Sequence, residues 1–154
     1  MTLTELYIEN ESLRQANCRL RVLLADRVQE SSLSSSKEVA LRYLEKLSGD
    51  KQENFVVALL DNKHRLIKDV LVTRGTLNQS LVHPREVFAP AIELRAAAII
   101  ILHNHPSGDT TPSQQDLDIT KRLCEVGQIV GITVLDHVIV GGNTYLSFLD
   151  EELL

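Results

Sequence analysis

The chain has 154 residues, which is enough for one globular domain with a short appendage. Hydrophobic residues make up 44% and charged residues 24%, so the composition is typical of a soluble protein with a real core. The net charge of -5 argues against a protein that coats nucleic acid, because such proteins carry an excess of Lys and Arg.

The cysteine content and the apolar runs indicate the compartment. Cys18 and Cys124 form no CxxC pair, so they predict free thiols in a reducing environment. The first residues, MTLTELYIENESLRQ, lack the apolar run of a signal peptide, and the apolar stretch at 96–102 is far too short to span a bilayer. We therefore expect a cytoplasmic protein with no membrane partner.

Residues 1–30 predict an N-terminal helix that forms a short coiled coil. The segment has no Gly or Pro after Met1, and leucine recurs with a period of seven. Asn at two of the a positions is a known device for fixing a two-stranded register. We expect a homodimer through residues 3–27, with packing of this helix on its own domain as the alternative. The a positions are Leu3, Asn10, Asn17 and Leu24, and the d positions are Leu6, Leu13 and Leu20.

Residues 31–36, SSLSSS, have the composition of a linker, so we expect a second domain over 37–154. Its periodicity predicts a helix at 37–47, a buried strand at 55–60 and a returning strand at 66–73 that completes a hairpin. Pro84 predicts the start of a helix through Glu93, with Pro90 kinking it or delaying its true start.

The remaining pattern continues the alternation of helices and strands. A buried strand is expected at 96–102, and then a helix capped by Thr111, with Pro112 first and Gln114 as capping-box partner. We expect this helix to end near Val126, at Gly127. Strands are expected at 129–134, 138–140 and 145–148. The predicted fold class is α/β, with a mixed central sheet flanked by helices and preceded by the N-terminal helix.

The segment HNHPSGDTTPSQQD carries the strongest chemical signal. His103 and His105 are two residues apart at the end of a predicted strand, so their imidazoles point to the same side. Ser113 and Asp116 are three apart on the first turn of the next helix and share a face. Two nitrogens and one carboxylate with an open fourth position are the ligand set of a catalytic zinc, so we predict Zn²⁺ on His103, His105 and Asp116.

Hydrolysis at such a site needs further groups. Neutral histidines bind the metal, so affinity should fall below roughly pH 6. Zinc-activated water, with a pKa of about 7, needs a general base that moves its proton to the leaving amine. Glu53, Glu86 and Glu93 are the candidates, and Ser113 is predicted to donate a hydrogen bond to the developing oxyanion.

Other polar residues receive structural interpretations. We interpret Asp109, Asp118 and Asp136 as solvated or capping residues. His137 is interpreted as a structural residue or one that supports the metal ligands, and His64 as a surface residue in a turn.

HxH, seven residues and SxxD form the JAMM, or MPN-plus, metallopeptidase signature, which His103, His105, Ser113 and Asp116 match. Together with RGTLNQS, VHPREVF and LDHVIVGG, residues 37–150 resemble the RadC-like JAMM/MPN-plus zinc metallopeptidases. The resemblance implies a cytidine-deaminase-like α/β fold and zinc on the two histidines and the aspartate. It also implies Glu53 as the catalytic acidic residue and carries the serine role to Ser113.

The resemblance makes a zinc-dependent metallopeptidase or isopeptidase the leading hypothesis, with a peptide or protein substrate. The alternatives are a non-catalytic MPN-type protein-binding scaffold and a DNA-repair accessory protein. RadC-like proteins often carry a helix-hairpin-helix-like region before this domain, where this chain has the predicted coiled coil instead. That departure and the acidic composition weaken the expectation of nucleic-acid binding.

Overall fold

The structure is a computed structural model that describes residues 33–75 and 82–154, together with residues 2, 8, 9, 12, 13 and 16. The chain divides into one unit at residues 1–31 and another at residues 32–154. The coiled-coil positions of residues 3–27 lie outside the described residues except for Leu13, so the coiled coil and the homodimer stay predictions.

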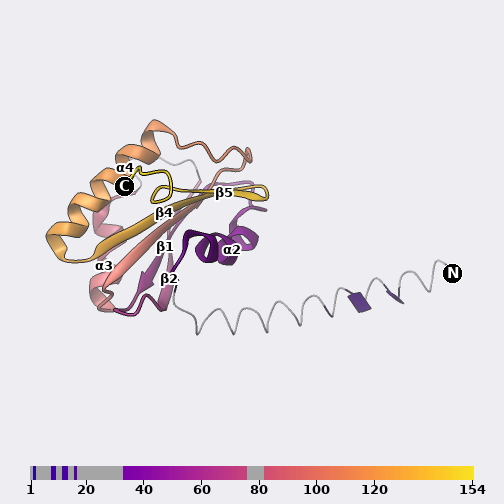
Figure 1. Cartoon of the computed structure of the whole chain (residues 1–154), viewed down its shortest axis with the longest axis horizontal. Coiled ribbons are helices and arrows are strands. Elements are labelled where there is room, and N and C mark those ends of the chain that lie inside the picture. Colours follow the sequence, from indigo (N-terminus) through magenta and orange to yellow (C-terminus); the bar gives the residue numbers. More distant parts are fainter. Residues whose placement is uncertain (1, 3–7, 10–11, 14–15, 17–32, 76–81) are drawn as a thin grey trace. The chain divides into compact units, whose positions relative to one another are not determined.

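The second unit is built on a mixed five-stranded sheet with the strand order β2-β1-β3-β4-β5 (Figure 1). Strands β1 and β2 form the predicted antiparallel hairpin, and β1 also pairs antiparallel with β3. Strand β3 pairs parallel with β4, and β5 returns antiparallel to β4. The predicted mixed α/β sheet is therefore confirmed. The strands are β1 (Asn54–Leu60), β2 (Leu66–Arg74), β3 (Ala98–Asn104), β4 (Thr133–Gly141) and β5 (Thr144–Ser147).

Helices cover both faces of this sheet. Helix α2 (Ser36–Leu47), capped by the Ser35 side chain, packs on one face, and helices α3 (Pro84–Glu93) and α4 (Gln114–Val130) pack on the other. Every residue of β1 and β3 is buried, because these central strands are covered on both sides. The continuous apolar runs at 55–60 and 96–102 reflect this double burial.

Helix α4 starts later than the sequence predicted. The expected cap at Thr111 is wrong: Ser113 is the cap, and it forms a capping box with Asp116. Both Ser113 and Thr111 have side chains able to cap, and both are followed three residues later by a polar partner. Asp116 decides between them, because its carboxylate accepts the Ser113 N–H at 2.7 Å.

The predicted end of α4 at Gly127 is also wrong, because the helix continues to Val130 and Gly131 caps it with φ 76°. Gly127 serves close packing instead. A Cβ at this position would lie 2.5 Å from the Ile132 carbonyl oxygen. The separate strands expected at 129–134 and 138–140 are replaced by the end of α4 and one continuous strand, β4.

Helix α3 begins at Pro84 as expected, so the alternative of a delayed start is wrong. Pro90 lies inside the helix, which still extends to Glu93. No helix in the described part of the chain is long and apolar enough to cross a membrane.

The pleat of β3 determines which side chains face α4. Ile99 and Ile101 belong to the core beneath α3 and α4, whereas Ile100 and Leu102 face α2. His103 continues the first series, so its imidazole projects toward α4 at the carboxyl end of the strand. In a β3–α4–β4 crossover this end of the strand lies beside the start of the helix, where α/β proteins commonly place their sites.

Candidate metal centre

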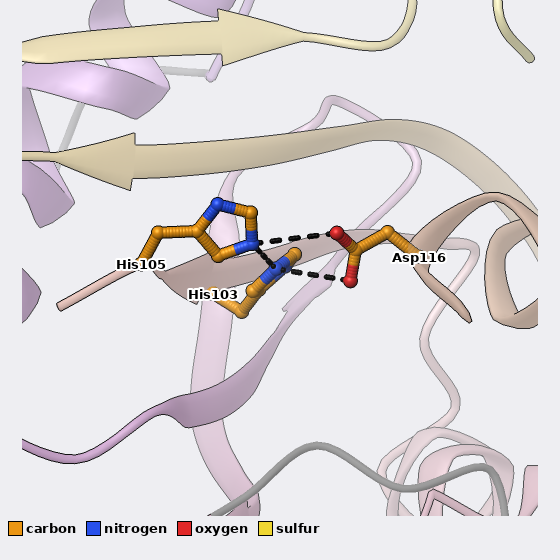
Figure 2. A group of neighbouring side chains, drawn as sticks. All are labelled: His103, His105 and Asp116. Atoms are coloured by element: carbon orange, nitrogen blue, oxygen red, sulfur yellow. Dashed lines mark hydrogen bonds and ion pairs between the residues drawn. The ribbon is translucent and has the colours of Figure 1, made fainter. Parts of the chain in front are cut away.

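The site forms where β3 ends and α4 begins (Figure 2). His103 is the penultimate residue of β3, and His105 directly follows the strand. Asp116 lies in the first turn of α4 and points back toward both imidazoles. The structure thus brings together the three side chains that the sequence predicted as metal ligands.

Three ligand atoms converge at this point. The Nε2 atoms of His103 and His105 are 2.9 Å apart. The carboxylate of Asp116 reaches both rings, with Oδ1 at 3.3 Å from His103 Nε2 and Oδ2 at 3.3 Å from His105 Nε2. His103 and Asp116 are buried, whereas the His105 side chain keeps 13% of its surface exposed. The site is therefore open to solvent on the His105 side.

The hydrogen bonds of His105 identify its free ring nitrogen. Its Nδ1 lies 2.7 Å from the carbonyl oxygen of Asp109, and a carbonyl can only accept a hydrogen bond. Nδ1 must therefore carry the proton. In the neutral ring, Nε2 then presents its lone pair to the centre of the site, which is the form that binds a metal.

Electrostatics in the metal-free site hold a proton between these groups. The hydrogen bond to Asp116 raises the pKa of His105 above 6.5, against the opposing effect of burial, and the Asp109 carbonyl and the charge of Glu53 also raise it. Burial alone would raise the pKa of Asp116, but the adjacent imidazoles of His103 and His105 outweigh it and hold that pKa far below its usual value. Asp116 is therefore ionised near neutral pH.

The donor set fits a zinc ion. Tetrahedral bonds of 2.0–2.1 Å would separate neighbouring ligand atoms by about 3.3 Å, close to the distances found here. All three ligand atoms lie within 4.8 Å of one another. Two imidazole lone pairs and a carboxylate at such short range repel one another unless a cation lies between them. The buried His-His-Asp group can therefore bind a metal ion, and its two nitrogens favour zinc over magnesium or calcium.

Ser113 caps helix α4, and this role is compatible with its predicted hydrogen bond to the oxyanion. Its side-chain oxygen accepts the Asp116 N–H at 3.1 Å, while its own N–H donates to the Asp116 carboxylate. This capping box orients the predicted metal ligand. Because the hydroxyl accepts in this contact, its proton remains able to donate, so the predicted oxyanion role is compatible with the geometry.

Of the three candidate bases, Glu53 is the one whose segment adjoins the metal centre, because Phe55, two residues further on, pairs with His103 across β1 and β3. Its charge contributes to the raised pKa of His105. Glu86 is exposed and pairs with Arg85, and Glu93 is exposed at the end of α3. Glu53 itself is half-buried just before β1, and its carbonyl oxygen accepts the N–H of Gly75 at 2.8 Å. Its catalytic role remains a prediction.

Asn104, between the two histidines, fixes the position of the Glu53 segment. Its fully buried amide accepts the N–H of Asn54 at 2.7 Å and donates to the carbonyl of Gln52 at 2.9 Å. These bonds hold the residues on both sides of Glu53 against the strand that carries His103. Asn104 was not predicted as a functional residue, although its place inside HNH puts its side chain on the face of the strand opposite to both histidines.

His137 lies directly behind His103. Its ring is fully buried, with Nε2 at 2.7 Å from His103 Nδ1 and Nδ1 at 2.6 Å from the Thr120 hydroxyl. Burial and the neighbouring His103 lower the pKa of His137 well below its ordinary value, so the ring is neutral. This position matches the interpretation that His137 supports the metal ligands.

The other histidine and aspartate residues interpreted from the sequence are exposed, with one exception. His64 and Asp118 are exposed, and Asp109 accepts hydrogen bonds from Thr111 on the surface. The solvated interpretation of Asp136 is wrong, because its carboxylate is buried. It accepts hydrogen bonds from two backbone N–H groups and a hydroxyl, those of His137, Leu149 and Ser147.

Residues 33–153 match the model of the RadC-like JAB domain. The chain belongs to the RadC-like JAB domain family. Its geometry agrees with that membership, because the residues of the HxH and SxxD motifs converge at one end of a mixed sheet.

Bacterial proteins designated UPF0758 are similar over the same region. The chain is 48% identical to the one from Syntrophotalea carbinolica over 121 residues, which is 79% of this chain and 53% of the relative. It is 57% identical to the one from Pelobacter propionicus over 104 residues, 68% of this chain and 45% of the relative. The match to the Enterococcus faecalis protein is 38% over 144 residues, 94% of this chain and 61% of the relative. The chain thus spans about half the length of the first two.

Proposed function

We propose that this chain is a zinc-dependent hydrolase that cleaves a peptide or isopeptide bond. The observation that carries the proposal is the convergence of two imidazole Nε2 atoms and one carboxylate beside the segment of Glu53. The JAB-domain family includes hydrolases, which supports the same reaction class.

His103, His105 and Asp116 would hold the zinc ion. A bound zinc ion lowers the pKa of a water molecule to about 7 and polarises a carbonyl oxygen. The exposed edge of His105 is the side from which water and substrate enter, because the other two ligands are buried.

Glu53 and Ser113 would supply the proton transfer and the oxyanion contact. As water oxygen adds to the carbonyl carbon, the Glu53 carboxylate takes the proton of the water. The C–N bond then breaks, and Glu53 returns the proton to the leaving amine. The Ser113 hydroxyl would donate to the carbonyl oxygen as negative charge develops there.

The test combines metal content with cleavage. The full chain should contain about one zinc per chain and cleave fluorogenic casein or peptides that carry an acylated lysine side chain. Glu53→Gln should keep its zinc and lose about 10²–10⁴-fold in rate, the usual contribution of a general base. Glu93→Gln is the matched control and should cleave normally, because Glu93 is exposed at the far end of α3.

Two outcomes would refute the proposal. A Glu53→Gln variant that cleaves at the wild-type rate would remove Glu53 from the mechanism. A zinc-loaded wild-type protein that cleaves neither probe would favour the protein-binding scaffold.

A further inference from the structure

A chain of three hydrogen bonds connects two of the predicted metal ligands through the protein interior. It runs from His103 Nδ1 to His137 Nε2 at 2.7 Å and from His137 Nδ1 to the Thr120 hydroxyl at 2.6 Å. It ends where that hydroxyl donates to the carbonyl oxygen of Asp116, also at 2.6 Å. His103 and Asp116 are thus linked behind the metal centre as well as across it.

The direction of every proton in this chain follows from its last member. A carbonyl oxygen only accepts, so the single proton of the Thr120 hydroxyl points at Asp116. The hydroxyl can then only accept from His137, which places a proton on His137 Nδ1. A neutral imidazole carries one proton, so His137 Nε2 is an acceptor and takes the Nδ1 proton of His103. The Nε2 lone pair of His103 is left free to face the centre of the site.

The surroundings of His137 keep this arrangement in place. The ring has no exposed surface and stacks on Phe148, with ring centroids 4.4 Å apart and an interplanar angle of 25°. Phe55 contacts it edge-on, with ring centroids 6.0 Å apart. Asp136 accepts the backbone N–H of His137, and it also accepts the Ser147 hydroxyl and the Leu149 N–H, which flank Phe148 along the chain. It therefore anchors the backbone that carries both rings.

We infer that His137, oriented by Thr120, is a positioning residue that fixes the tautomer of His103 so that its Nε2 binds the metal. The inference rests on the metal site of the proposed function. It assigns to these two residues a role in metal affinity that does not depend on any substrate. Ligands of metal ions are commonly oriented by such outer partners, whose loss weakens metal binding about 10–100-fold.

The first test is zinc affinity, measured on the full chain near neutral pH by competition with a chromophoric chelator. His137→Leu removes the acceptor and should weaken zinc binding about 10–100-fold. His137→Gln keeps an acceptor near the position of Nε2 and should restore most of the affinity. A purely structural role would make the two variants equal.

Thr120 provides a matched pair that changes little volume. Thr120→Val removes the hydroxyl and leaves the His137 Nδ1–H without an acceptor, so zinc affinity should fall. Thr120→Ser keeps the hydroxyl and should bind zinc as the wild type does. This pair decides the question even if His137→Leu does not fold.

The second test is the tautomer of His137 in the zinc-loaded protein, from long-range nitrogen–proton correlation spectra. We expect the proton on Nδ1, and a proton on Nε2 would overturn the inference. Equal zinc affinity of Thr120→Val and Thr120→Ser would overturn it while leaving the zinc site itself intact. A wild-type protein that binds no zinc would overturn this inference and the proposed function together.

Discussion

The substitution Asp116→Asn tests whether the cluster at the end of β3 is a metal centre. Asn has the shape of Asp and retains an amide oxygen, which can still accept the Ser113 N–H that the carboxylate accepts at 2.7 Å. The capping box that starts α4 should therefore survive. What changes is the charge at the point where the carboxylate faces two imidazole nitrogens at 3.3 Å.

The size of the effect follows from binding linkage. Zinc at about 100 times its dissociation constant stabilises the folded wild type by about 2.7 kcal/mol. For a domain of this size, that corresponds to a rise in Tm of roughly 8–13 °C. If losing the carboxylate weakens binding about 100-fold, the same zinc concentration contributes only about 0.4 kcal/mol, or roughly 1–2 °C.

The assay is thermal unfolding of each protein with chelator and with buffered zinc. Asp118→Asn is the matched control: it makes the same change of charge on the same helix, at an exposed side chain outside the His-His-Asp group whose carboxylate accepts a hydrogen bond from Gln114. Its zinc-dependent rise should equal that of the wild type. If Asp116→Asn shows the full wild-type rise, Asp116 is not a ligand and the assignment of the site fails.

Two further predictions concern His105 and Asn104. The pKa of His105 is raised above 6.5 in the metal-free protein, so its contribution to stability is complete below that pH and disappears as the pH rises through the folded value. Zinc displaces this proton, so zinc affinity should increase by about tenfold for each pH unit in the same window. The measurement is zinc titration at several pH values from about 5.5 to about 8. An affinity that does not change with pH would contradict the proton displacement. Asn104→Ala should leave the buried backbone N–H of Asn54 without its acceptor, which costs about 1–3 kcal/mol, whereas the Gln52 carbonyl keeps the hydrogen bond from the Asn54 side chain at 3.2 Å. The cleavage rate of this variant should fall more than its zinc affinity, because the lost hydrogen bonds hold the Glu53 segment and not the metal ligands. An equal loss of rate and affinity would show that Asn104 acts on the ligands instead.

Sequence alone predicted the elements whose signals are local. The apolar run at 55–60 and the turn after it determine a buried strand and a hairpin, and the structure has both. Pro84 marks a helix start through side-chain chemistry that needs no distant partner. The predicted metal ligands also have local signals, because HxH on a strand and SxxD on a helical turn each place two side chains on a shared face.

Local signals failed where two equivalent residues compete. Thr111 and Ser113 are both good caps, and Gly127 and Gly131 can both end a helix. Asp116 decides the first case, because its carboxylate accepts the Ser113 N–H, and close packing decides the second. Gly127 stays helical because its missing Cβ lets the helix approach the Ile132 carbonyl, and Gly131 takes the left-handed conformation that ends it.

The sequence by itself determined the fold class, most of the strands and helices, and the His-His-Asp group at the end of β3 that is predicted to bind the metal. Only the tertiary structure decided which residues contact His103 on the side away from the predicted metal position. His137 comes from β4 and Thr120 from the second turn of α4, and no spacing along the chain relates them to His103. They meet because β3 and β4 pair in parallel while α4 crosses between them, which places residues distant in sequence behind one imidazole. Such contacts depend on the register of the whole sheet, and a single sequence encodes that register only through the packing of all its parts.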